Sequence, residues 1–213
     1  MATKTRSKAK TTRKKTAGKG KSKAASKTKK LTLQPRDTAS EAQLALHATP
    51  QKQLEEILKR GQKPRPELLD GWRFRGLNVG FGAKLIGVQK FIKIFKTIDY
   101  GFGQMMTGHN IVVKQNDIKA PYEKKLKNGE HKIQGVYLVE ENNQRFNAYD
   151  SSALLNYGRG DNPWYEPAKM LRDYLTQPYP DNNDLFLGKA YFAFGPLKIF
   201  GGYFILERLE EIE

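Results

Sequence analysis

The sequence predicts a mainly β protein, an antiparallel barrel with one or two short helices, preceded by a disordered basic tail. Short strand-like runs separated by turn residues fill the chain from Gly71 onward, as in sandwiches and barrels. Closing the sheet would leave no exposed strand edge. The positive charge is concentrated in the first thirty residues. We therefore predict a tail and linker over 1–48 and a barrel-like domain with a short N-terminal helix over 49–213.

The tail carries most of the formal net charge of +16, because residues 1–30 contain eleven Lys and two Arg but no Asp or Glu. Like charges repel and the apolar surface is small, so we expect this segment to be disordered. A cationic chain binds DNA or RNA by releasing counterions, without recognising sequence. Its composition resembles the tails of linker histones and of some bacterial nucleoid proteins. The alternative is a solubilising or ribosome-proximal tail without a dedicated partner. The predicted polyanion-binding residues are Lys4, Arg6, Lys8, Lys10, Arg13, Lys14, Lys15, Lys19, Lys21, Lys23, Lys27, Lys29 and Lys30.

A short helix is predicted where the linker meets the domain. Thr49 is expected to cap it, Pro50 suits its first position, and Gly61 ends it. An apolar face within residues 51–60 is expected to cover one end of the domain. That face consists of Leu54, Ile57 and Leu58.

The β domain is divided by dipeptides that favour turns. The predicted strands lie near 71–78, 99–106, 109–116, 132–140, 144–150, 152–157, 184–194 and 197–208. The predicted turns are Thr107-Gly108, Asn128-Gly129, Asn142-Asn143 and Gly195-Pro196.

Residues 83–96 interrupt this pattern with apolar residues at helical spacing. The expected helical face is Leu85, Val88, Phe91, Ile92 and Phe95. Gly87 and several β-branched residues weaken the helix prediction, and Phe91, Lys93 and Phe95 also alternate as in a strand. The lysines of this segment, Lys84, Lys90, Lys93 and Lys96, suggest peripheral contact with a membrane surface or a lid over a ligand portal. The alternative is an amphipathic element packed on the barrel.

A second helix is predicted over 167–175, because Pro167 suits a first helical position. Its apolar surface is expected to come from Ala168, Met170, Leu171 and Leu175.

Both ends of the β domain resemble calycins, the family of lipocalins and fatty-acid-binding proteins. Gly71-Trp72 opens the first strand, and Arg208 closes the last. In that family a Gly-x-Trp signature places the Trp at the barrel base, beneath a basic residue of the last strand. Here Gly71 directly precedes Trp72, which departs from that spacing. The resemblance, which extends to uncharacterised bacterial lipocalin-like domains, implies barrel closure by Trp72 and Arg208 through a cation–π contact. Another antiparallel β or α+β fold is the alternative.

Tyrosines and phenylalanines on inward positions of such a barrel suit an amphipathic ligand with an apolar body and a polar head. Lys189, if it points inward with Leu187 and Tyr191, is expected to meet an anionic headgroup. The alternative is that the aromatic side chains fill the barrel completely. The predicted ligand-binding residues are Phe74, Tyr137, Phe146, Tyr157, Lys189, Tyr191 and Phe204.

The sequence contains no catalytic or metal-binding pattern, and we expect no cofactor. There is no cysteine, and the three histidines lack metal-ligand spacing. An enzyme is therefore not favoured, although a buried carboxylate with a raised pKa beside a tyrosine would support one.

No apolar run is long enough to predict a transmembrane helix, and no secretory signal is evident. We expect a cytoplasmic or nucleoid-associated protein that binds a small apolar or amphipathic ligand without catalysis, with a tail that associates with polyanions. The alternative is a nucleic-acid-associated protein whose domain is a scaffold or a protein-interaction module. Deleting residues 1–30 separates the two, because binding that survives would implicate Arg73, Arg75 and the lysines of 84–93.

Overall fold

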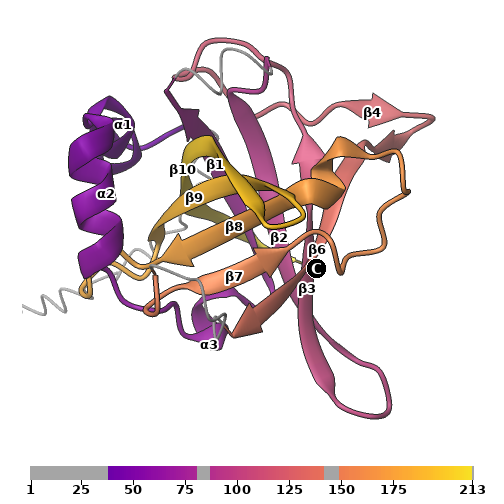
Figure 1. Cartoon of the computed structure of the whole chain (residues 1–213). Helices are drawn as coiled ribbons and strands as arrows, with labels where there is room; N and C mark the ends of the chain where they lie inside the picture. Colours follow the sequence, from indigo (N-terminus) through magenta and orange to yellow (C-terminus); the bar gives the residue numbers. More distant parts are fainter. Residues whose placement is uncertain (1–37, 81–86, 142–148, 213) are drawn as a thin grey trace, which may run out of the picture. The chain divides into compact units, whose positions relative to one another are not determined.

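The β domain is a closed eight-stranded antiparallel barrel, as the sequence predicts (Figure 1). The chain divides into two compact units, 1–32 and 33–213. The computed structural model describes residues 38–80, 87–141 and 149–212, all within the second unit. The predicted tail and its basic residues therefore lie outside the described residues.

The barrel strands follow the order β1-β10-β9-β8-β7-β6-β3-β2, and β1 pairs with both β10 and β2 to close the ring. These strands are β1 (Trp72–Val79), β2 (Lys90–Asp99), β3 (Gln104–Val112), β6 (Ile133–Glu141), β7 (Ala153–Asn156), β8 (Leu171–Thr176), β9 (Leu185–Phe194) and β10 (Leu197–Glu211). A separate two-stranded hairpin joins β4 (Leu126–Lys127) to β5 (Glu130–His131). The helical elements are α1 (Glu41–Ala48), α2 (Gln51–Arg60), α3 (Pro66–Leu69) and the 3₁₀ turn η1 (Pro167–Met170).

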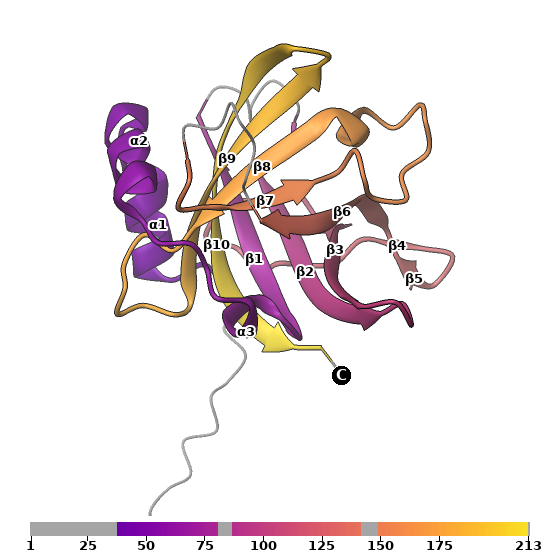
Figure 2. The same cartoon turned by 60° about the horizontal axis from the view of Figure 1, so that its bottom comes forward.

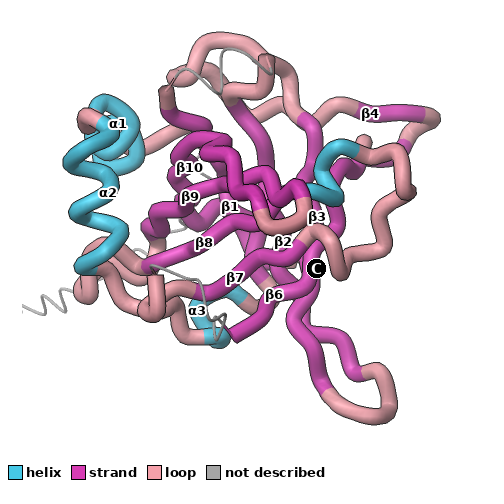
Figure 3. Tube along the Cα trace, viewed as in Figure 1, coloured by secondary structure: helices cyan, strands magenta, loops and turns pink. Residues whose placement is uncertain are grey.

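The side chains alternate between the barrel interior and its outer surface, as the period of a β-strand requires. The interior holds an aromatic core that includes Phe74, Phe95, Tyr137, Phe186 and Phe204. A second core lies outside the barrel, where α1 and α2 pack beside β9 and β10 (Figures 1 and 2). The outer face of the sheet is thus covered by helices on one side, and Figure 3 shows how little helix the rest of the unit contains.

The base of the barrel is closed by α3 together with residues from the first and last strands. Leu68 and Leu69 of α3 are buried in the interior core. The Arg208 guanidinium lies 4.3 Å from the centre of the Trp72 ring, and its Nη2 donates to the Leu68 carbonyl at 2.7 Å. Stacking on the ring and a backbone hydrogen bond together fix this end of the barrel.

The predicted helix over 83–96 is wrong for the part that the structure describes. Residues 90–99 form β2, in which Phe91, Lys93 and Phe95 point inward while Ile92 and Ile94 pack outside. The strand alternation that the sequence also allowed is therefore correct. Pairing with β1 and β3 satisfies this backbone on both sides, which outweighs the local helical spacing. Residues 81–86, including Lys84 and Leu85, lie outside the described residues.

The predicted helix over 167–175 is also wrong beyond its first turn. Only 167–170 form a 3₁₀ turn, and the chain continues as strand β8 from Leu171. β8 pairs with β7 and β9, so tertiary pairing again decides the conformation. As a result Asp173 occupies an inward strand position between Leu171 and Leu175.

The hairpin predicted at Thr107-Gly108 is displaced along the chain. β2 runs to Asp99 and β3 begins at Gln104, so the turn lies between them and 107–108 are inside β3. Gly101 and Gly103 supply the positive φ angles of this turn, and Asp99 Oδ1 accepts the Gly101 N–H at 2.7 Å. The dipeptide Thr107-Gly108 contains a single glycine and does not provide such a pair.

Two other predicted turns are confirmed. Asn128 and Gly129, with φ angles of 55° and 84°, join β4 to β5. Gly195, with φ of 59°, joins β9 to β10. The predicted turn at 142–143 and most of the predicted strand over 144–150 lie outside the described residues.

The N-terminal part of the unit contains more helix than the sequence predicts. The helix after the linker is confirmed as α2, but Pro50 is its N-cap while Thr49 ends the preceding helix. That preceding helix, α1, begins at the cap Ser40, whose side chain accepts the Gln43 N–H. The sequence prediction places residues 41–48 in the linker, because no clear helical face is visible in their short apolar pattern.

Candidate functional site

A cavity of about 160 Å³ lies inside the barrel, toward the end opposite α3. Its wall is formed by the last residues of β1 and β3, by the first residues of β2, β6 and β8, and by residues 190, 192 and 201–204 of β9 and β10. Most of its lining is apolar, with Phe91, Leu171 and Phe204 among the contributing side chains. The aromatic side chains therefore do not fill the barrel completely.

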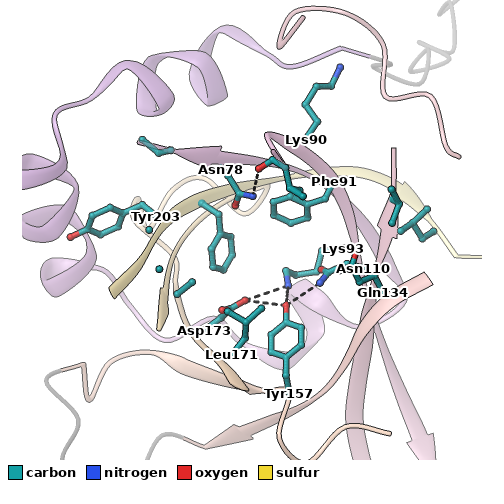
Figure 4. Close-up of a pocket in the computed structure, with 18 of the residues that line it drawn as sticks. Asn78, Lys90, Phe91, Lys93, Asn110, Gln134, Tyr157, Leu171, Asp173 and Tyr203 are labelled. Atoms are coloured by element: carbon teal, nitrogen blue, oxygen red, sulfur yellow. Dashed lines mark hydrogen bonds and ion pairs between the residues drawn. The ribbon is translucent and has the colours of Figure 1, made fainter. Parts of the chain in front are cut away.

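Four polar residues, three from different strands and one from the turn after β7, meet at one side of this cavity, as Figure 4 shows. Lys93 Nζ of β2 donates to the hydroxyl of Tyr157 at 2.6 Å and lies 3.6 Å from Asp173 Oδ2 of β8. The Tyr157 hydroxyl donates to Asp173 Oδ2 at 3.1 Å and accepts the Asn110 side-chain amide at 3.2 Å. We call Lys93, Asn110, Tyr157 and Asp173 the interior polar cluster.

Burial changes the proton affinities of this cluster. It lowers the pKa of Lys93 to about 8, although the charge of Asp173 acts in the opposite direction. It raises the pKa of Asp173 against the opposing effect of Lys93, and it raises the pKa of Tyr157 well above its usual value. Burial therefore disfavours the charged form of Lys93 and also that of Asp173.

The cluster leaves two buried acceptors without a hydrogen-bond donor among the described residues. These are Asp173 Oδ1 and Asn110 Oδ1, and both residues line the cavity. A buried acceptor without a donor costs about 1–3 kcal/mol. Such groups are expected where a ligand supplies the missing partner.

The structure separates the predicted ligand-binding residues into two groups. Tyr157 and Phe204 line the cavity, whereas Phe74 and Tyr137 are fully buried in the interior core. Tyr137 donates its hydroxyl to the Ile94 carbonyl at 2.6 Å, so its polar atom is already satisfied. Phe146 lies outside the described residues.

Lys189 and Tyr191 lie on the outer face of β9 beneath α2, not in the interior where the sequence analysis placed them. The Lys189 ammonium lies 2.7 Å from Glu55 Oε2 of α2 and also donates to the Tyr149 hydroxyl. The strand register explains this orientation, because Phe186, Gly188 and Ala190 take the inward positions of β9.

Glu55 is the acceptor at the centre of this outer cluster. Its burial raises the carboxyl pKa, but hydrogen bonds from Lys189, Tyr203 and Tyr149 outweigh that effect and lower the pKa to about 2. The cluster thus holds α2 against the barrel with a stable carboxylate. Because its donors and acceptor satisfy one another, we assign it a structural role.

Of the basic residues considered for membrane or polyanion contact, Lys90, Lys93 and Arg75 are buried, as in the alternative of an element packed on the barrel, whereas Lys96 is exposed and Lys84 lies outside the described residues. Lys90 points away from the cavity and donates to Asn116 Oδ1 and to three loop carbonyls at 2.6–3.1 Å (Figure 4). Arg75 is fully buried and ion-paired with Glu207, while Lys93 belongs to the interior polar cluster. Each of these cations has its partners inside the protein.

Sequence reasoning missed Asn110 and Asp173 as site residues and assigned Lys93 to a surface role. Lys93 lies between Phe91 and Phe95, and Asp173 between Leu171 and Leu175, each at an inward strand position. A charged residue between two apolar ones at i−2 and i+2 is the signal that would identify both. The helix predictions for the two segments hid that signal.

Comparison with protein-family models, curated proteins and solved structures gave no match for this chain. Among residues 38–80, 87–141 and 149–212, no helix combines the length and apolar character needed to cross a membrane. In the same ranges, no three His, Asp or Glu side chains are grouped as metal ligands.

Proposed function

We propose that this protein binds a small amphipathic ligand in the barrel cavity, with the apolar body against the aromatic wall and the polar head at the interior polar cluster. The observation that supports it most is the pair of unpartnered buried acceptors, Asp173 Oδ1 and Asn110 Oδ1, beside a mostly apolar cavity. Apolar cavities with a few convergent polar groups are typical of small-molecule sites.

The resemblance of the two barrel ends to calycins supports the same function. The contact between Trp72 and Arg208 matches the closure that this resemblance implies. The ligand is expected to enter at the opposite end, where the cavity lies. The cationic tail, in this proposal, associates the carrier with DNA or RNA through charge alone.

The test compares binding of 1-octanol to the full chain and to two variants of β9, by isothermal titration calorimetry. Ala190 lines the cavity, whereas Ala193 does not and pairs with Lys198. Ala190→Leu is expected to weaken binding at least tenfold, about 1.4 kcal/mol, by occupying the space of the ligand. The matched control Ala193→Leu is expected to bind as the unmodified chain does.

Native mass spectrometry of the chain purified from cells adds an independent measurement. A stoichiometric amphipathic passenger that Ala190→Leu no longer retains would support the proposal. Absence of a passenger together with no 1-octanol binding, or equal binding by both variants, would contradict it.

A further inference from the structure

We propose that Lys93 forms a reversible imine with the ligand, whose polar head is therefore an aldehyde carried on an apolar body. This inference rests on the proposed function, since it names the chemical class of the ligand in the same cavity. It also gives the interior polar cluster a chemical task beyond binding.

The position of the Lys93 amine is the first argument. Its side chain is 1 % exposed, yet the residue lines the cavity, so its Nζ faces a space that a small molecule can occupy. Lys90, on the same strand, is surrounded by oxygens of the 116–121 loop, and Lys189 is held by Glu55 outside the barrel. Lys90 and Lys93 both line the cavity, but only the Lys93 amine, of these two, lies at the interior polar cluster.

The environment of Lys93 also favours the neutral amine that attacks a carbonyl. A desolvated lysine in an apolar pocket is a known form of activated nucleophile. With a pKa of about 8, roughly a tenth of the Lys93 side chains are neutral at pH 7, far more than for an exposed lysine. Asp173 and Tyr157 lie close enough to exchange protons with it.

The reaction needs no oxidant, reductant or metal ion. The Lys93 Nζ lone pair attacks the aldehyde carbon, forming a C–N bond while the carbonyl π electrons move to oxygen. The nitrogen proton passes through Asp173 or Tyr157 to that oxygen, giving a carbinolamine. A proton from the same groups moves to the carbinolamine oxygen and lets the C–O bond break, so that water leaves as the C=N bond forms. The remaining N–H proton then returns to the group that donated. Amine and aldehyde are thereby converted to imine and water, and hydrolysis reverses each step.

The remaining members of the cluster fit the intermediate and the product. A carbinolamine carries an O–H donor that neither the amine nor the aldehyde has in that position. Asp173 Oδ1 and Asn110 Oδ1 are buried acceptors that lack a donor among the described residues, so they suit this hydroxyl. The Asp173 carboxylate also provides the counter-charge for a protonated imine.

The apolar wall explains why the ligand body must be apolar and why the imine persists. Phe91, Leu171 and Phe204 border the cavity and keep bulk water from the C=N bond. A polar aldehyde would lose its hydration on entry without compensation from these side chains.

The test treats the full chain with octanal and sodium cyanoborohydride at neutral pH, and maps the alkylated lysines by peptide mass spectrometry. We expect the Lys93 peptide to be octylated at least about tenfold faster than the exposed lysines. Tyr157→Phe is expected to slow octylation at Lys93 by at least about tenfold, because one proton donor is removed.

Lys93→Met and Lys96→Met form a matched pair on β2, since Lys96 is exposed and lies outside the cavity. Lys93→Met is expected to abolish the fast phase of octylation, whereas Lys96→Met retains it. If Lys93→Met does not fold, Tyr157→Phe still decides the question through its rate.

Two results would overturn the imine and are distinguishable from each other. Octanal that binds in the cavity without faster labelling at Lys93 removes the imine while the proposed carrier function stands. Failure of both 1-octanol and octanal to bind removes the carrier function and the imine together.

Discussion

Among residues 38–80, 87–141 and 149–212, two ion pairs have both side chains buried, and these pairs differ in their surroundings. Arg75 and Glu207 lie outside the barrel wall near α1, where Glu207 Oε2 accepts Arg75 Nε at 2.8 Å and lies 2.7 Å from its Nη2. The same oxygen accepts the Ser40 N–H at 3.2 Å. Lys93 and Asp173 lie inside the barrel at 3.6 Å, bridged by the Tyr157 hydroxyl.

The outer pair fastens the first helix to the barrel. Gln43 of α1 donates its side-chain amide to the carbonyls of Arg75 and Ile205, at 3.0 and 3.2 Å. Helix and strands are thereby joined through charged and neutral hydrogen bonds around one buried pair. We expect this region to contribute stability and no chemistry.

The inner pair has the opposite character. Its charges are held farther apart, one carboxylate oxygen has no donor among the described residues, and burial moves the pKa of both groups toward their neutral forms. A pair left incomplete beside a cavity costs stability and is typical of a site prepared for a ligand. The two pairs therefore differ in their surroundings, because the inner pair borders a cavity whereas the outer pair joins α1 to the barrel wall.

The largest effect is expected from breaking the outer pair. Glu207→Ala leaves the Arg75 guanidinium buried without its carboxylate, and we expect the free energy of unfolding to fall by about 3–5 kcal/mol. Urea denaturation monitored by circular dichroism measures this loss. Glu210→Ala on the same strand is the control, because Glu210 is half-exposed and its ion pairs with Arg73 and Lys124 should contribute less than about 1 kcal/mol. Equal losses in the two variants would contradict the structural role of the outer pair.

A smaller effect is expected from Lys93→Met. Asp173 loses its partner, but its raised pKa lets it take up a proton instead of remaining a buried anion, so we expect a loss of about 2 kcal/mol. The double variant Lys93→Met/Asp173→Leu should regain most of that stability while losing octanal labelling at Lys93. Denaturation of the three chains in parallel checks this order. A double variant less stable than Lys93→Met would show that the inner pair is structural like the outer one.

The smallest effect is expected on the pH dependence of the stability, which distinguishes the inner pair from the outer one. The pKa of Lys93 is about 8 in the folded protein and 10.5 for an ordinary lysine, so the unfolded chain binds more protons between these values. Stability therefore rises with pH in that window, by about 1 kcal/mol between pH 8 and 9, and Lys93→Met should lack this rise. Above pH 10 the tyrosines ionise in the unfolded chain and oppose it.

A second group of residues supplies the control for this pH profile. It is the cluster outside the barrel in which Glu55 accepts hydrogen bonds from Lys189, Tyr149 and Tyr203. The pKa of Glu55 is lowered from 4.5 to about 2, so its stabilisation is present above pH 4.5 and is lost as the pH falls toward 2. Lys93→Met should leave this acid limb unchanged. A change in the acid limb, or a persistent alkaline rise, would contradict the assignment of the titration to Lys93.

The mainly β barrel and two of its turns could be predicted from the sequence alone. Alternating apolar residues and the positive-φ positions at Asn128-Gly129 and Gly195 act locally, so they are visible without the fold. The contact between Trp72 and Arg208 was predicted through the resemblance of the two barrel ends to calycins. These features depend on neighbours in the chain or on the order of the strands.

Only the tertiary structure decided which residues form the site. Residues 90–96 and 171–175 have apolar spacings that fit a helix as well as a strand, and pairing with neighbouring strands selects the strand. That choice turns Lys93 and Asp173 into the barrel, and the register of β9 turns Lys189 out of it. Because a strand presents alternate residues to opposite faces, conformation and register together fix what enters the cavity, and neither is determined locally.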